Sequence, residues 1–313
     1  MNMELFVLGT GGTMPLPGRF LTSVLLRREG EVFLFDSGEG TQVSLRSLNL
    51  KWKKISVILI SHTHADHVTG LPGMLMLSSQ VDREEPLVII GPPRIREFVE
   101  ASRSTLEMYI NFEIRVQEIE RPWEKQLVYE TDAYTIRSVP LRHSRTCVGY
   151  VFEEKPRPGV FYPEKAAEAA VPRGPLWSSL QRGESITLED GSTVDPSRVL
   201  GPPRRGRKFS YITDTLPIDT IAPEVSGSDL LICEGMFGNE FRETAYEKRH
   251  MTAEDAGRIA KEAGGVKKMG LIHYSPRYTN RDLKELLHEA RAVFPQTVLT
   301  KEKMHFPIPF EEE

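Results

Sequence analysis

The sequence predicts an α/β protein in which β-sheets pack against each other and helices cover the outside. Short runs rich in β-branched and aromatic residues dominate the first hundred residues, and Gly, Pro or Asp bounds each of them. Helical patterns appear between and after these runs. Because strands and helices do not alternate strictly, the order favours packed sheets with outer helices over a regular βαβ repeat.

The expected elements follow the chain in order. Strands are expected at 4–8, 22–28, 31–38, 55–61, 86–93, 112–120, 126–132, 134–141 and 148–154, and again at 209–214, 229–235 and 268–275. Helices are expected at 70–79, 95–109, 252–264 and 281–294. Thr252 and Asp255 have the spacing of a capping box, and Thr279 or Asn280 is expected to cap the last helix.

A segment in the middle of the chain interrupts this pattern. Residues 155–208 are rich in Pro and Gly and carry ten Lys or Arg against six Asp or Glu. A short helix at 164–170, a turn at 171–184 and a hairpin at 186–194 with Asp190-Gly191 at its tip are expected within it. The predicted organisation is a core of residues 1–152 and 207–313 with an inserted arm at 153–206.

Composition narrows the class of protein. A net charge of −4 over 313 residues excludes the global positive field of many nucleic-acid binders, so positive charge that meets a polyanion must be local. Cys147 and Cys233 lie far apart and offer no disulfide framework, which suits a reducing compartment. No apolar run reaches the roughly 18 residues that span a bilayer, and no signal peptide is apparent. We expect a cytoplasmic protein without membrane contact.

The run HTHADH at positions 62–67 is the most informative motif. It places His62, His64, Asp66 and His67 directly after an apolar run, although the whole chain has eight histidines. Imidazole and carboxylate groups are ligands of zinc and similar cations, and two metals about 3.5–4 Å apart can act together in hydrolysis. The motif therefore predicts a two-metal hydrolase site. The alternative is a polar surface loop that happens to contain several histidines.

One loop cannot complete two coordination shells, so further ligands are expected at the ends of other strands. His143, Asp214 and His273 each lie where a strand pattern ends. Alone, they have simpler interpretations as a polar loop residue, a turn former or helix cap, and a hydrogen-bonded core histidine. Their common position at strand exits makes all three candidate ligands. His288 and His305 are expected to be structural.

The glycines of the segment GTGG lack the GK[ST] of a phosphate-binding loop and the spacing of a dinucleotide fingerprint. Gly9, Gly11 and Gly12 are therefore expected to be permissive turn glycines near the active site.

Several segments together resemble the ribonuclease Z family of the metallo-β-lactamase superfamily, the tRNA 3′-processing endonucleases. They are, in chain order, LGTGGTMP, FLFDSGEGTQ, ISHTHADHVTGLPGML, PLRHSRTCVGY, YITDT and LIHYSPRY. HxHxDH alone occurs across the superfamily, whereas the combination of these segments is specific to a smaller group of proteins. The resemblance implies an α/β fold, the metallo-β-lactamase αββα sandwich, with an inserted flexible arm.

The resemblance also implies two Zn²⁺ per subunit, or Mn²⁺ in their place. Three histidines would hold one ion, a carboxylate and two histidines the other, and a second carboxylate would bridge them. The first ion would be held by His62, His64 and His143, and the second by Asp66, His67 and His273. Asp214 would bridge the two ions. Asp66 would also accept a proton from the attacking water.

A His-Glu-Ala-Thr motif and a later histidine assist the leaving 3′ oxygen in this family. Here the motif reads Cys233-Glu234-Gly235-Met236, which retains its glutamate, and His250 matches the later histidine. The resemblance thus implies catalytic roles for Glu234 and His250. The alternatives are a buried structural carboxylate paired with His250 or an arginine, and a histidine that merely flanks a helix N-terminus.

The implied activity is zinc-dependent removal of the 3′ trailer from precursor tRNA, which leaves a 3′-hydroxyl on the tRNA. Residues 158–184 are similar to the family's arm that grips tRNA, where basic side chains contact phosphates. Precursor tRNA is the expected partner, and a homodimer is implied. One alternative is another metallo-β-lactamase-fold phosphodiesterase acting on small or different nucleic-acid substrates. A second is a non-catalytic RNA-binding scaffold on a decayed hydrolase fold.

Overall fold

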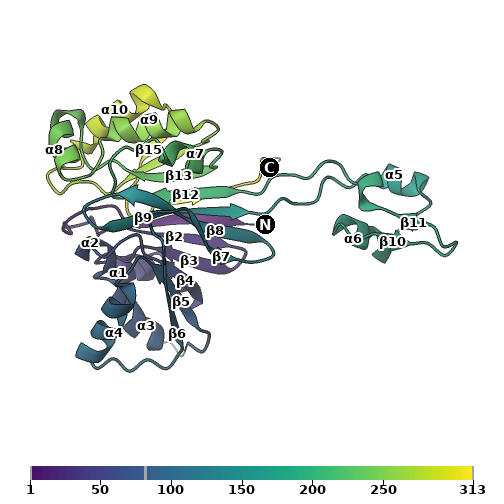
Figure 1. Ribbon diagram of the computed structural model, residues 1–313, viewed down its shortest axis with the longest axis horizontal. Coiled ribbons are helices and arrows are strands. Elements are labelled where there is room, and N and C mark those ends of the chain that lie inside the picture. The colour runs from purple at the N-terminus through teal and green to yellow at the C-terminus, as the bar shows by residue number, and fades with distance from the viewer. Residues whose placement is uncertain (1, 81–82, 312–313) are drawn as a thin grey trace. The chain divides into compact units, whose positions relative to one another are not determined.

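A computed structural model describes residues 2–80 and 83–311 (Figure 1). The chain divides into two compact units. The core unit contains the residues up to Thr131, Thr135–Phe152 and the chain from Arg207 onward, and the inserted unit contains Asp132–Tyr134 and Glu153–Gly206. In the described part of the chain, no helix is long and apolar enough to cross a membrane.

Two seven-stranded sheets form the centre of the core unit. In the first sheet, antiparallel strands occupy one half and parallel strands the other. Its order is β16 (His305–Pro307), β1 (Met3–Gly9), β2 (Ser23–Arg28), β3 (Glu31–Phe35), β4 (Ile55–Leu59), β5 (Leu87–Gly91) and β6 (Ile114–Glu118).

The second sheet has four consecutive parallel strands at one edge. Its order is β15 (Thr297–Leu299), β14 (Met269–Ile272), β13 (Leu230–Glu234), β12 (Lys208–Ile212), β9 (Thr146–Glu154), β8 (Tyr134–Arg142) and β7 (Gln126–Glu130). The carboxyl ends of parallel strands meet at one edge of a sheet, which is where ligands bind in many α/β proteins.

Aromatic side chains fill the space between the two sheets. Phe33 meets Phe152 with ring centroids 5.4 Å apart, and Phe35 meets Phe209 and Tyr211 at 5.2 and 5.7 Å. All of these side chains are buried. Such edge and tilted contacts between large rings stabilise the packing beyond the burial of their area.

Helices cover the outer face of each sheet, as Figure 1 shows. The first sheet is covered by α1 (Thr41–Ser47), α3 (Leu71–Ser79) and α4 (Ile95–Thr105), and the second by α7 (Ile221–Val225), α9 (Ala253–Ala263) and α10 (Leu283–Val293). The short helices α2 (Ala65–Val68) and α8 (Arg242–Glu247) lie in the connections. The layers are therefore helix, sheet, sheet, helix, and the predicted αββα fold class is confirmed.

The expected helices at 70–79, 252–264 and 281–294 agree with α3, α9 and α10 to within two residues, whereas α1, α2, α7 and α8 are not predicted. Thr252 and Asp255 form the expected capping box at α9. Thr279 exchanges hydrogen bonds with Asp282 just before α10, but the N-cap residue of that helix is Asp282, so the expected cap at Thr279 or Asn280 is wrong. However, α4 ends at Thr105 instead of Tyr109, because Glu107 adopts a left-handed conformation (φ 47°) and the chain turns so that Met108 packs on the first core.

The inserted unit has a small hydrophobic core of its own. Two helices, α5 (Pro163–Glu168) and α6 (Pro175–Gln181), pack with the hairpin β10 (Ile186–Thr187) and β11 (Thr193–Val194). Gly191 has a φ of 82° at the hairpin turn, as the Asp-Gly pair predicts. The expected turn at 171–184 is wrong, because residues 175–181 form α6.

The helix α6 forms because its sequence supplies both a start and a buried face. Pro175 occupies the first turn, where its missing N–H costs nothing, and Leu180 is fully buried. Leu176 and Trp177 pack beside Leu180 on the core of the inserted unit.

Two chain segments connect this small core to the rest of the chain by pairing with each other. Arg157 pairs with Arg204 through two backbone hydrogen bonds of 2.8 and 2.9 Å, and Phe161 pairs with Leu200. Gly159 permits close approach, since a Cβ atom there would lie 2.0 Å from the carbonyl oxygen of Gly201. The two segments form a narrow antiparallel stem.

Candidate metal centre

The predicted ligand side chains gather where strands of both sheets end. His62 and His64 lie in the loop after β4, and Asp66 and His67 lie in the single turn of α2 that follows. The other three ligands come from the ends of β8, β12 and β14 and are His143, Asp214 and His273. His288 lies on α10 and His305 pairs with Glu4 at the surface, so neither belongs to the cluster.

Four of these residues converge in a first group. His62 Nε2 lies 2.9 Å from His64 Nδ1, which lies 3.1 Å from His143 Nε2. Asp214 Oδ2 completes the group at 3.6 Å from His62 Nε2 and 3.7 Å from His143 Nε2. Three nitrogen lone pairs and a carboxylate oxygen thus face a common point.

A second group lies beside the first and shares the same aspartate. His67 Nε2 and Asp66 Oδ2 each lie 3.2 Å from His273 Nε2. Asp214 Oδ1 lies 3.2 Å from His67 Nε2 and 3.3 Å from His273 Nε2. The two oxygens of Asp214 therefore face different groups, which is the geometry of a bridging carboxylate.

The donor set and its spacing fit metal binding. Bonds of about 2.0–2.2 Å to a tetrahedral ion place ligand atoms roughly 3.3–3.6 Å apart. The separations in both groups are close to that range, and a cation would satisfy all the converging lone pairs at once. Among the described residues, every group that could hold a metal lies in this cluster. The arrangement supports binding of a divalent metal ion.

The protonation equilibria of the cluster reflect its buried negative charge. Burial raises the pKa of Asp214, but the surrounding histidines outweigh burial and hold that pKa well below its usual range. Burial lowers the pKa of His67, but Asp214 and Asp36 outweigh it and raise that pKa well above its usual value. A divalent cation would take the place of such protons, so metal binding would release them.

Hydrogen bonds to the other ring nitrogen fix the orientation of two of the histidines. His67 Nδ1 lies 2.7 Å from Asp36 Oδ2, and His143 Nδ1 lies 2.9 Å from the carbonyl oxygen of Arg249. In each case the bond leaves Nε2 facing the metal group. Such outer partners hold the tautomer and the ring direction of metal-binding histidines.

Asp36 is the functional residue that sequence reasoning missed. It accepts hydrogen bonds from the backbone N–H of Ser61, the Ser61 hydroxyl and the Tyr211 hydroxyl, all within 2.7–2.8 Å. The chain at Asp36 is left-handed, with φ 54°. An aspartate directly after the apolar strand β3, followed by Gly38 and Gly40, was the available signal.

His250 and Glu234 form a buried pair at the edge of the cluster. His250 Nδ1 lies 3.1 Å from Glu234 Oε2, and His250 Nε2 lies 3.9 Å from Asp214 Oδ2. Burial lowers the pKa of His250, but Glu234 outweighs it and raises the pKa to about 9. This arrangement favours the protonated imidazole, which can donate a proton toward the metal groups.

The residues that replace the family motif lie outside the cluster. Cys233 is fully buried in the core between the second sheet and its helices, and burial raises the pKa of its thiol. Met236 packs with Phe237 and Ala245. Because neighbouring residues of a strand point to opposite faces, Cys233 points into the core and Glu234 points toward the cluster. These substitutions thus change the core and leave the Glu234–His250 pair in place.

The GTGG glycines serve a different purpose from the predicted one. Gly9, Gly11 and Gly12 are absent from the described residues with positive φ, so turn conformation does not require glycine. Instead, a Cβ atom on Gly12 would lie 2.6 Å from the ring of His273, and one on Gly9 would lie 1.9 Å from the Leu21 carbonyl oxygen. Close approach of the backbone to a ligand side chain explains Gly12.

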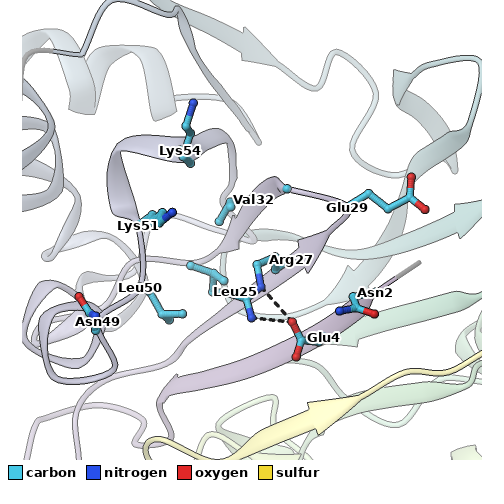
Figure 2. Close-up of a pocket in the computed structure, with 11 residues that line it drawn as sticks. Asn2, Glu4, Leu25, Arg27, Glu29, Val32, Asn49, Leu50, Lys51 and Lys54 are labelled. Carbon is cyan, nitrogen blue, oxygen red and sulfur yellow. Dashed lines mark hydrogen bonds and ion pairs between the residues drawn. The ribbon is translucent and has the colours of Figure 1, made fainter.

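The cluster opens into a pocket of about 320 Å³. Lys248 and Ser144 line it beside the ligand side chains. A larger hollow of about 1060 Å³ is lined by residues where β1, β3 and β4 begin, whereas the cluster follows the ends of strands. Figure 2 shows the residues that line this hollow. Its charged residues include Glu4 and Arg27, which pair with each other at 2.6 Å.

Solved structures share this architecture. The short form of human tRNase Z (ELAC1) superposes with a TM-score of 0.72 at 24% identity, covering 98% of this chain and 100% of that chain. The metallo-β-lactamase fold protein YhfI from Bacillus subtilis gives a TM-score of 0.67 at 20% identity, with coverage of 98% and 100%. Fold and cluster together define a metallo-β-lactamase-fold protein with a metal centre.

Sequence comparison narrows the class to one family. The chain is 59% identical to the ribonuclease Z of Treponema denticola over 312 residues, covering 100% of both chains. It is 44% identical to the ribonuclease Z of Borrelia hermsii over 309 residues, covering 97% of this chain and 96% of that one. The chain belongs to the ribonuclease Z family, as the motifs predict. A family model described as anti-Pycsar protein Apyc1 also matches residues 3–155.

We predict that Asp36→Asn lowers metal affinity by about 10- to 100-fold, because an amide holds the His67 ring less firmly than a carboxylate. Asparagine tolerates the left-handed backbone at this position, so the fold is expected to persist. Competition with a metal chelator measures the affinity. Asp219→Asn, the same change at an exposed turn, is the matched control. Equal affinities in the two variants would contradict the role of Asp36.

Proposed function

We propose that this protein is a metal-dependent endoribonuclease that removes the 3′ trailer from precursor tRNA and leaves a 3′-hydroxyl on the tRNA. The observation that carries the proposal is the pair of ligand groups joined by Asp214, with the Glu234–His250 pair beside them. Membership in the ribonuclease Z family supplies the substrate class.

The proposed centre holds two Zn²⁺ ions, or two Mn²⁺ ions in their place. Imidazole-rich ligand sets suit zinc, and both ions accept nitrogen and carboxylate ligands. The first ion would be bound by His62, His64 and His143, the second by Asp66, His67 and His273, and Asp214 would bridge the two. When bound, such ions make a nucleophile available at neutral pH and stabilise charge on the phosphate.

The chain's own residues would move the protons of the reaction. Asp66 accepts a proton from the attacking water, since a positioned carboxylate can act as a general base. His250 donates a proton to the departing 3′ oxygen of the tRNA, which becomes the 3′-hydroxyl. Glu234 holds the imidazole in place and keeps it charged. The phosphate remains on the 5′ end of the released trailer.

The inserted unit is proposed to be the arm that binds the tRNA. Lys165 lies over the ring of Tyr162 at 4.5 Å, and Arg173 lies over the ring of Trp177 at 5.5 Å. Both cations are exposed, so they present positive charge on a chain that is negative overall. Contacts of this kind fix a nucleic acid through its phosphates without reading bases.

We also propose a cytoplasmic homodimer. Val43 on α1 and Met76 on α3 are 53% and 44% exposed, and the two helices touch where Gln42 lies against Gly73. Exposed apolar residues on two touching helices support an interface between subunits. Both cysteines are buried and free, which suits a reducing compartment.

A second candidate is a phosphodiesterase of the same fold that acts on small or different nucleic-acid substrates. The match of residues 3–155 to the anti-Pycsar protein Apyc1 model favours keeping it, since that segment includes part of the proposed metal centre. The inserted unit separates the two candidates, because a small substrate does not need a second binding surface.

The proposed function predicts that purified protein cuts a 3′-extended precursor tRNA next to the discriminator nucleotide. Asp66→Ala is expected to lower turnover by at least about 100-fold, because it removes a ligand and the proton acceptor. Cys233→Ala is expected to stay within about twofold, because the thiol lies in the core. Mapping the cut and measuring kcat for each variant decides the matter. Uncut precursor, or near-normal turnover with Asp66→Ala, would contradict the proposal.

Removing the inserted unit should separate tRNA processing from phosphodiester chemistry. Residues 158–203 can be replaced by Asn-Gly, since Arg157 and Arg204 already pair and this dipeptide closes a two-residue hairpin. We expect precursor cleavage to fall by about 100-fold or more at fixed enzyme concentration. Hydrolysis of bis(p-nitrophenyl) phosphate should persist. Equal loss of both activities in a folded variant would reject the assigned role of the arm.

A charged substitution in the expected interface tests the proposed dimer. Val43→Asp places a carboxylate in the expected interface, where burial without a partner is costly. We predict a shift from dimer to monomer in sedimentation velocity. Leu127→Asp, at a residue equally exposed on β7, is the control and should leave the mass unchanged. A monomeric wild-type protein would refute the dimer without touching the proposed chemistry.

A further inference from the structure

A second hollow, of about 280 Å³, lies next to the catalytic pocket. We call it the flanking subsite. Its lining residues are Thr63, Arg94, Glu97, Phe98, Ala101 and Arg145. They come from the HTHADH loop, from α4 and the residue before it, and from the turn between β8 and β9.

The flanking subsite and the catalytic pocket share two walls. Thr63 lines the flanking subsite, and the next residue, His64, lines the pocket. Likewise, Arg145 lines the flanking subsite, and the residue before it, Ser144, lines the pocket. Consecutive Cα atoms are about 3.8 Å apart, so each wall is one residue thick. A polymer whose reacting bond lies in the pocket can therefore place its next unit in the flanking subsite.

The charges of the flanking subsite favour an anion. Arg94 and Glu97 pair with each other, with Nε to Oε2 at 3.0 Å, and largely cancel. The exposed guanidinium of Arg145 makes no hydrogen bond or ion pair with the residues that the structure describes. One positive charge thus remains available beside the partly buried ring of Phe98.

We propose that the flanking subsite binds one unpaired nucleotide of the precursor tRNA beside the scissile bond. The base stacks on Phe98, and Arg145 binds the adjoining phosphate. An aromatic face with an arginine is the usual platform for single-stranded nucleic acid, whose bases are free to stack. The inference rests on the proposed function and adds a place for the strand next to the cut.

The test measures binding of a short RNA independently of tRNA cleavage. A single-stranded RNA hexanucleotide competes with hydrolysis of bis(p-nitrophenyl) phosphate by the metal-loaded protein, and its inhibition constant is measured at several salt concentrations. Arg145→Ala removes the charge, and Phe98→Leu removes the aromatic face but keeps apolar packing. Arg103→Ala, an exposed arginine on the same helix that does not line the subsite, is the matched control.

Arg145→Ala should raise the inhibition constant about tenfold, and its slope against log salt should fall by about 0.7, the value of one phosphate contact on a single strand. Phe98→Leu should raise the constant by about 5- to 10-fold without changing the slope. Arg145→Lys should keep the slope, because the charge remains. Hydrolysis of the small diester alone should stay unchanged in all these variants.

Two results would overturn the flanking subsite. One is an inhibition constant in Arg145→Ala and Phe98→Leu that stays within about twofold of Arg103→Ala. The other is an equal loss of small-diester hydrolysis, since Arg145 would then act on the metal centre itself. A wild-type protein that hydrolyses the diester but leaves precursor tRNA uncut would refute the proposed function alone. The inhibition constants of the hexanucleotide would still test whether the flanking subsite binds RNA.

Discussion

The structure of the core unit depends on one buried carboxylate. Asp214 is 1% exposed, and its oxygens lie between 3.2 and 3.9 Å from ring nitrogens of five histidines. An isolated buried charge is strongly destabilising, so it requires partners with donors or a cation. Those partners come from both sheets, and the sheets must therefore end at a common edge.

The packing between the sheets transmits this requirement into the core. Tyr211 extends from the second sheet and donates its hydroxyl hydrogen to Asp36 at the end of β3 in the first. Asp36 in turn holds His67, whose Nε2 lies 3.2 Å from Asp214. The ring of Tyr211 also packs on Phe35. A change in the aromatic layer therefore alters the direction of a histidine in the metal centre.

The sequence was sufficient to predict the layers and the side chains that meet, and the reasons are physical. Strand runs, a capping box and the density of HTHADH are local patterns. Asp36 was missed because its role depends on Tyr211, 175 residues away. The helix α6 was missed for a related reason, since Pro and Gly suggest a turn unless a small core exists for Leu180 to enter. Gly12 was misread because only the His273 ring explains it.

The motif that departs from its family illustrates the same limit. From the sequence alone, Cys233-Glu234-Gly235-Met236 suggests that the motif has lost two functional side chains, its histidine and its threonine. On β13, the alternation of side chains sends Cys233 into the core and Glu234 toward His250. Packing volume in the core therefore constrains position 233, whereas the charge of the pair with His250 constrains position 234.

The paired stem of the inserted unit also bears on how the chain folds. An open loop inserted between β9 and β12 would impose a closure entropy on the pairing of these neighbouring strands, and that entropy grows with the logarithm of loop length. Because Arg157 pairs with Arg204, the insertion is closed near its base. To the folding core, the long insertion then resembles a tight hairpin, and its far end is free to vary in size without slowing assembly of the second sheet.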